Sequence, residues 1–106
     1  MPRVYNYAVL TAGDMSQATL TSTVVPLSEC TYCSFQYVYT GSPVGTIQVQ
    51  ASNDNVNFTN IDRSLINITA AGSSVVNLSE IGYIYARVLY TKTSGTGSLT
   101  ITVGTK

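Results

Sequence analysis

Residues 35–51 read Phe-Gln-Tyr-Val-Tyr-Thr-Gly-Ser-Pro-Val-Gly-Thr-Ile-Gln-Val-Gln-Ala, and this stretch decides the fold class. Large apolar side chains occupy every second position before the Gly-Ser-Pro break. They do so again after it, where Ile47, Val49 and Ala51 alternate with two glutamines. A period of two is typical of half-buried β-strands, because successive side chains point to opposite faces of a sheet. The stretch therefore predicts two strands, joined by a tight hairpin at Gly41-Ser42-Pro43.

The same period continues outward along the chain. Leu99, Ile101 and Val103 alternate with threonines, while residues 82–91 carry large side chains on both faces. That pattern predicts a central strand or one covered by a partner. Clusters of turn residues at 52–55, 71–73 and 94–97 favour further chain reversals, the last two as hairpins. We expect strands over residues 4–11, 18–25, 33–40, 44–51, 56–61, 64–69, 74–78, 82–91 and 98–103.

Eight or nine short strands at this spacing predict an all-β fold without helices. The architecture expected is a single antiparallel β-sandwich, jelly-roll-like, that spans residues 1–106 as one domain.

Composition excludes several classes of function. Five basic residues offset five acidic ones, so the net charge is zero, and 9% of residues are charged against roughly 25% in an average soluble protein. Without histidine there is no Ser-His-Asp or Cys-His catalytic unit, so we expect no enzyme, catalytic residue or cofactor. Five scattered cations predict no nucleic-acid partner, and short apolar runs predict no membrane span. The N-terminal residues lack the apolar core of a signal peptide, so we expect synthesis in the cytoplasm.

Cys30 and Cys33 form a single Cys-Thr-Tyr-Cys motif. A redox role needs this motif at the start of a helix, whereas here it precedes a strand. A zinc site needs two further ligands, which only a second subunit would supply. We therefore expect two reduced thiols at the entrance of a strand, one of them inward, and no metal.

Asn53, Asp54, Asn55 and Asn57 form a candidate ligand loop. Their oxygens could serve calcium or sugar hydroxyls, but calcium loops usually contain more carboxylates. Asp54 and Asp62 are the only two acidic residues close together in the sequence, and a glycosidase would need such a pair of carboxylates facing each other across a cleft. The favoured interpretation is turn chemistry, in which Asp54 caps backbone amides and Asp62 is solvated.

Eight tyrosines are the most distinctive feature of the composition. Tyrosine serves in a core, in a subunit contact or as a platform for a sugar ring. Arg87 lies among apolar neighbours, so we expect it either on the wet face or paired with Glu80, Asp62 or Asp54. An ion pair is the favoured interpretation, and contact with a partner subunit is the second. The candidate interface residues are Tyr5, Tyr7, Tyr83, Tyr85 and Arg87.

Two longer stretches, residues 35–61 and 82–106, resemble small β-sandwich modules of bacteriophage virion proteins. In that pattern one strand ends in Thr-Gly, the next leads to a Ser-Asn-Asp-Gly-x-Asn-Trp-like turn, and a late strand carries Tyr-x-Arg-Val before a Ser-Gly-x-Gly hairpin. The chain departs from the pattern at Asn55, where glycine is usual, and at Phe58, where tryptophan is usual. Asparagine accepts positive φ, and phenylalanine suits an aromatic core position.

The resemblance implies a structural virion protein that self-assembles or docks in the capsid, as a capsid or decoration protein located in the virion. Its expected partners are further copies of itself and other virion proteins. The alternative is a carbohydrate-binding module, or a receptor-binding spike or tail component, which would bind host glycans. An enzyme is the third possibility, and the missing histidine argues against it.

Overall fold

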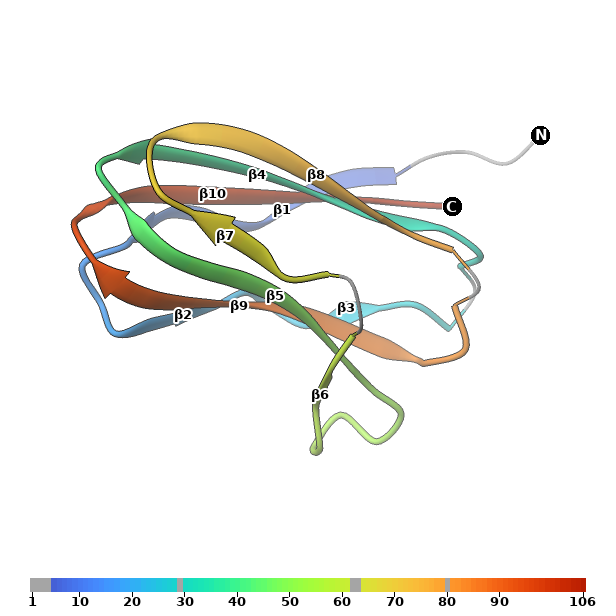
Figure 1. The fold of residues 1–106 in the computed structure, drawn as a ribbon. Coiled ribbons are helices and arrows are strands. Elements are labelled where there is room, and N and C mark those ends of the chain that lie inside the picture. The colour runs from blue at the N-terminus through green and yellow to red at the C-terminus, as the bar shows by residue number, and fades with distance from the viewer. Residues whose placement is uncertain (1–4, 29, 62–63, 80) are drawn as a thin grey trace.

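The computed structural model describes residues 5–28, 30–61, 64–79 and 81–106, which form ten strands and no helix (Figure 1). No helix in this part of the chain is long and apolar enough to cross a membrane. The strands are β1 (Tyr5–Asp14), β2 (Thr19–Thr21), β3 (Val25–Pro26), β4 (Cys33–Gly41), β5 (Val44–Ser52), β6 (Thr59–Asn60), β7 (Ile66–Ile68), β8 (Gly72–Leu78), β9 (Tyr85–Ser94) and β10 (Gly97–Thr105).

The strands form two antiparallel sheets that pack face to face. Sheet A has the order β1-β10-β4-β8, and sheet B has the order β2-β9-β5-β6, with β3 also pairing with β9 and β7 with β5. In Figure 1 sheet A lies above sheet B, and the loop leading to β6 projects below. The chain passes from one sheet to the other at each of the connections β4–β5, β7–β8 and β9–β10, as in a jelly roll. The prediction of an all-β antiparallel sandwich is therefore confirmed.

The three predicted hairpins are wrong in a consistent way. Each of the turns 41–43, 71–73 and 94–97 is a corner between the sheets, because the strands on either side belong to different sheets. A hydrogen bond joins the corners at 41–43 and 94–97: the Ser42 amide donates to the Thr96 carbonyl oxygen at 2.9 Å. Glycine and proline indicate that a chain reverses, but they do not indicate which strand it pairs with afterwards.

Several predicted strands differ in extent from those observed, as three examples show. Residues 18–25 divide into β2 and β3, because the Ser22 amide bonds to Val88 in sheet B while the next amide, that of Thr23, bonds to Val9 in sheet A. Residues 56–61 shorten to β6, since the turn before it captures the first amides. Residues 82–91 begin pairing only at Tyr85.

The core lies between the sheets and follows the predicted period of two. Phe35, Tyr37, Ile47 and Val49 are fully buried, and Leu99 with its alternate neighbours fills the same layer from β10. Ile84 lies outside this period and is 41% exposed. The residues before β9 do not continue its alternation, because the Ile84 amide and carbonyl are held by Asn53 and Leu27 instead of by a neighbouring strand.

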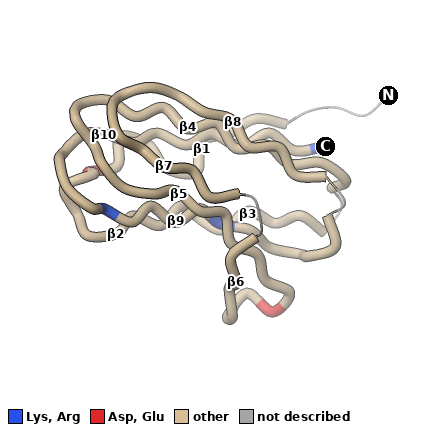
Figure 2. Tube along the Cα trace, in the orientation of Figure 1, with Lys and Arg blue, Asp and Glu red and all other residues tan. Residues whose placement is uncertain are grey.

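Charge is almost absent from the sheets (Figure 2). Asp14 at the end of β1 is the one charged residue in the strands of sheet A, and Arg87 and Lys92 are the two in sheet B. Both outer faces therefore consist mainly of hydroxyl, amide and small apolar side chains.

Candidate interaction surfaces

The predicted ligand loop is built around one carboxylate. Asp54 Oδ1 accepts the backbone amides of Val56 and Asn57 at 2.9 and 2.8 Å, and Oδ2 accepts Asn57 Nδ2 at 2.8 Å. Ser52 Oγ donates to Asp54 Oδ1 at 2.8 Å and accepts the Asp54 amide at 3.1 Å. These bonds, led by that from the Asn57 amide, hold the pKa of the Asp54 carboxyl well below its usual range.

The loop therefore satisfies its own hydrogen bonds. Asn53 Oδ1 accepts the Ile84 amide at 3.1 Å, and Asn55 has φ of 60°, as expected for an asparagine where glycine is usual. The turn interpretation of Asp54 is confirmed. Asp62, the other member of the acidic pair, lies outside the described residues.

Arg87 lies on the outer face of sheet B, beside this loop. Its Nε donates to Gln50 Oε1 at 2.9 Å, and its guanidinium carbon lies 4.1 Å from the centre of the Phe58 ring. Gln50 Nε2 in turn donates to Asn60 Oδ1 at 3.0 Å. Among the expected acidic partners, Asp54 uses its carboxylate within its own loop, and Asp62 and Glu80 lie outside the described residues.

Phe58 does not fill a core position, as the sequence suggested, but covers Arg87 on the outside of the sandwich. A cation over an aromatic face is stabilised by the ring quadrupole, and this contact ties β6 and its loop to β9. No local sequence pattern indicates this pairing, because the two side chains lie far apart along the chain.

The structure separates the candidate interface residues into three places. Tyr85 lies half-buried on the outer face of sheet B, next to Arg87 in β9, whereas Tyr83 precedes the strand and packs against the core. Tyr5 and Tyr7 lie on β1, in register with the inward residues Thr105 and Val103 of sheet A. They are 59% and 42% exposed, so sheet B leaves them uncovered at this end of the sandwich.

The two cysteines are free thiols at the entrance of β4. Cys33 is buried and inward, as expected, and Cys30 is half-buried. Burial raises the pKa of the Cys33 thiol to about 12, so the thiolate that redox or metal chemistry requires is disfavoured.

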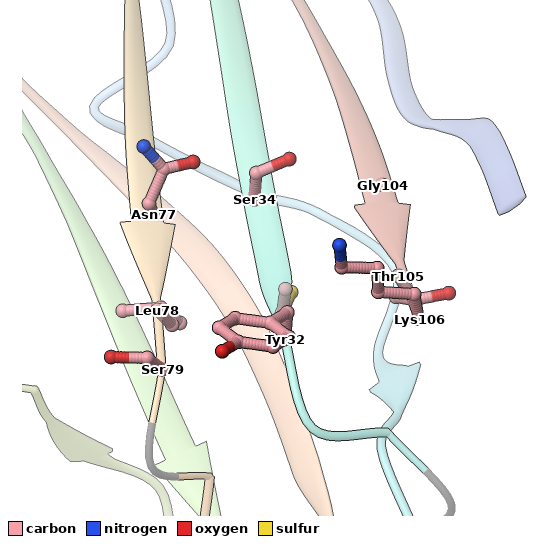
Figure 3. A pocket seen from close by; sticks show the side chains of 9 residues that line it. Tyr32, Ser34, Asn77, Leu78, Ser79, Gly104, Thr105 and Lys106 are labelled. Atoms are coloured by element: carbon pink, nitrogen blue, oxygen red, sulfur yellow. The ribbon is translucent and has the colours of Figure 1, made fainter. Parts of the chain in front are cut away.

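A pocket that sequence reasoning missed lies at the end of sheet A where β8 and β10 end and β4 begins (Figure 3). Its volume is about 460 Å³, within the range of small-molecule sites. The Tyr32 ring, 52% exposed, forms one wall, and Lys106 Nζ lies 5.1 Å from the ring centre. The remaining lining is mostly neutral: Cys33, Ser34, Asn77, Leu78, Ser79, Gly104 and Thr105.

Local pairing positions the pocket. Ser34 lies between Asn77 of β8 and Gly104 of β10 in the register of sheet A, and Gly104 has no side chain to fill the outer face there. The amides of Thr31 and Tyr32 donate to the Lys106 carbonyl oxygen at 2.7 and 2.9 Å, which fixes the Tyr32 wall. Tyr32 lies within the Cys-Thr-Tyr-Cys motif, whose residue pattern carries no signal of a pocket.

No protein-family model and no curated protein sequence matches the chain. Solved structures share its fold. YomS of the SPBc2 prophage superimposes with a TM-score of 0.63 at 12% identity, over 98% of this chain and 95% of YomS. Tailspike protein 4 of bacteriophage CBA120, in its enzymatically active domain, gives 0.61 at 14% identity, over 97% of this chain and 15% of the tailspike chain. A carbohydrate-binding module, CBM4, gives 0.52 at 12% identity, over 83% of this chain and 61% of that chain.

At these identities the likeness establishes a shared β-sandwich fold. The fold occurs in phage and prophage proteins and in a carbohydrate-binding module alike, so function has to be argued from the surfaces of this chain.

Proposed function

We propose that this chain is a structural component of a bacteriophage or related virus particle, a capsid or decoration protein that acts by assembly and without catalysis. The observation that carries the proposal is the uncharged surface of sheet A, whose four strands contain Asp14 as their one charged residue. A surface with so little charge offers no electrostatic barrier to close packing of many copies.

The outer face of sheet A suits a packed contact in its chemistry as well. Thr100, Thr102, Gln36 and Ser34 alternate with the buried residues of β10 and β4 and present neutral hydrogen-bonding groups. Val38 and Val75 add exposed apolar area on the same face, at 42% and 56% exposure. Interfaces commonly combine apolar contact with neutral hydrogen bonds in this way.

The shared fold is consistent with this proposal. YomS is a prophage-derived chain of nearly the same extent, and the CBA120 protein is a tailspike. Both proteins are similar to this chain in fold alone.

Fractionation of virus particles tests the proposal. Particles purified from a culture that expresses this chain are analysed by quantitative mass spectrometry. We expect the chain to sediment with the particles, in a constant ratio to the major shell protein across preparations. Recovery of the chain in the unassembled fraction alone, with intact particles free of it, would reject the virion role.

A second candidate function, carbohydrate recognition, is favoured by the Tyr32 pocket. An exposed aromatic ring beside the Ser34 and Ser79 hydroxyls and the Asn77 amide combines a stacking surface with neutral hydrogen-bonding groups. The predicted ligand loop is a poorer candidate, because Asp54, Asn53 and Asn57 already bond within the protein. The fold of CBM4 is consistent with this function.

A glycan array separates this candidate from the first. We expect that a glycan bound at the pocket no longer binds the Tyr32→Ala variant and still binds the matched control Tyr5→Ala. Tyr5 suits the control because its ring in the parent chain is similarly exposed, at 59%. Absence of binding by the folded parent chain to every glycan would eliminate carbohydrate recognition at this pocket.

A further inference from the structure

Open sheet edges are sites of association, because an edge strand presents unpaired amides and carbonyls. Proteins guard such edges with short strands, proline, charge, bulges or a covering segment. Sheet B ends on one side in β2 and β3, of three and two residues, and β3 contains Pro26. On the other side it ends in β6 and β7, of two and three residues.

The β1 edge of sheet A is guarded differently. Its register with β10 shifts between Ala8 and Leu10 and again between Leu10 and Gly13, and Ala12 has φ of 49°. The Thr23 amide also donates to the Val9 carbonyl oxygen at 3.0 Å, so the chain that crosses to sheet B closes part of this edge.

β8 has none of these guards. Its seven residues pair with β4 in unbroken register, from Leu78 opposite Cys33 to Gly72 opposite Tyr39. They contain no charge and no proline, and within the described residues no hydrogen bond to the far side of this strand is present. At about 3.3 Å per residue the open edge is roughly 23 Å long.

We propose that β8 is a self-association strand, which pairs antiparallel with β8 of a second copy about a twofold axis at Val75. The pairing would join the two four-stranded sheets A into one continuous eight-stranded sheet. The inference deepens the proposed function and rests on it for its purpose in a particle, while the pairing itself follows from β8 alone.

The occupant is a second copy because β8 is complementary to itself. In this register Val75 lies opposite Val75 of the partner subunit, and apolar contact forms at the axis. Ser73 lies opposite Asn77 of the partner subunit, which places a hydroxyl against an amide on each flank of the outer face. Cross-strand pairs of these kinds stabilise a sheet, and charges that would oppose each other across the seam are absent.

Charge at the axis tests the proposal in the full chain. Light scattering over a hundredfold concentration range measures the monomer–dimer equilibrium of the parent, Val75→Lys and the control Val56→Lys. Val75 is 56% exposed, and Val56 is 78% exposed in the loop of sheet B, so both variants should fold. We expect a parent dimer that Val75→Lys weakens roughly tenfold or more, because two lysines would face each other across the axis. Val56→Lys should leave the dimer unchanged.

A crosslink gives a second and independent readout. In Val75→Cys the two thiols meet at the axis, where opposite residues lie close enough for a disulfide. We expect oxidation to yield a covalent dimer faster than in Thr100→Cys, which places a thiol on β10 in the interior of the same face, and faster than in the parent with Cys30 and Cys33 alone.

Three results would overturn the pairing: a parent that stays monomeric throughout, a dimer that Val75→Lys leaves intact, or Val75→Cys crosslinking no faster than Thr100→Cys. These outcomes are separate from those of particle fractionation. A β8 dimer found outside virions would reject the proposed function and keep the pairing, and a virion component that fails the dimer tests would do the reverse.

Discussion

At the scale of single residues, the buried tyrosines differ in whether their hydroxyls are bonded. Tyr39 is paired with Ser74 Oγ at 3.0 Å, whereas the hydroxyls of Tyr37 and Tyr90 are buried and have no hydrogen-bond partner among the described residues. A buried polar group without a partner lowers stability, so the three side chains should respond differently to loss of the hydroxyl.

Tyr37→Phe is expected to raise the free energy of unfolding by about 1 kcal/mol, because it removes an unbonded hydroxyl and keeps the ring. Tyr39→Phe, the matched control, should lower it by about 1 kcal/mol through loss of the bond to Ser74. Urea unfolding of both variants measures the difference. A Tyr37→Phe protein that is less stable than the parent would contradict the assignment of an unbonded hydroxyl.

Asn55 provides a second residue-scale prediction. Its φ of 60° favours glycine or asparagine over residues with an ordinary Cβ. Asn55→Gly should leave the free energy of unfolding nearly unchanged, and Asn55→Ala should lower it by about 1 kcal/mol. Thermal or urea unfolding measures both, and equal stability of the alanine and glycine variants would show that the backbone conformation carries no cost here.

The sequence predicted this conformation but not the role of Phe58. A turn that contains Asn-Asp-Asn depends on its own few residues, so its chemistry is readable from them. The contact of Phe58 with Arg87 depends on where β6 and β9 lie in the finished sheet, and no local pattern carries that information.

At the scale of elements, the close pairing of β5 and β9 depends on Gly45. A Cβ there would lie 2.3 Å from the Thr91 carbonyl oxygen and 3.0 Å from Tyr90 Cε1. The strands approach each other at this point because glycine has no side chain, and the register shifts between Val44 and Gly45.

Gly45→Ala is therefore expected to lower the free energy of unfolding by roughly 2–3 kcal/mol, since backbone as well as the buried Tyr90 ring would have to move. Gly72→Ala is the matched control: its Cβ would meet the Tyr39 ring at 3.5 Å, an ordinary contact, and stability should change by about 0.5 kcal/mol or less. Chemical denaturation measures both variants, and a well-tolerated Gly45→Ala would show that the two strands separate at little cost.

The positions of the strands were predicted better than the pairing between strands. The period of two located the strands of the core, and the Gly-Ser-Pro and Ser-Gly-Thr-Gly segments located two of the chain reversals. Whether a reversal forms a hairpin or a corner depends on which sheet the next strand joins. The strands β4 and β10 belong to sheet A, whereas β5 and β9, which follow and precede them along the chain, belong to sheet B. Long-range pairing therefore required the structure.

At the scale of the whole molecule, the absence of histidine removes the side chain that ordinarily titrates near neutrality. The groups whose burial matters titrate at alkaline pH instead. Burial raises the pKa of the Cys33 thiol from 9.0 to about 12 and also raises that of the Tyr37 hydroxyl above 10.0. In the unfolded chain both groups release their protons near their ordinary values.

The folded state therefore retains protons that the unfolded state loses once the pH exceeds about 9, and stability falls as the pH rises from there toward 12. We expect urea midpoints that change little between about pH 6 and 8 and then decline. Cys33→Ala should remove the part of the decline that begins near pH 9, and Tyr37→Phe should reduce the part that begins near pH 10. Part of the latter decline should persist in Tyr37→Phe, because burial also raises the pKa of the Tyr7, Tyr83 and Tyr90 hydroxyls. If the urea midpoints of the parent hold steady to pH 11, these groups ionise in the folded protein. Water would then reach the Cys33 thiol and the Tyr37 hydroxyl.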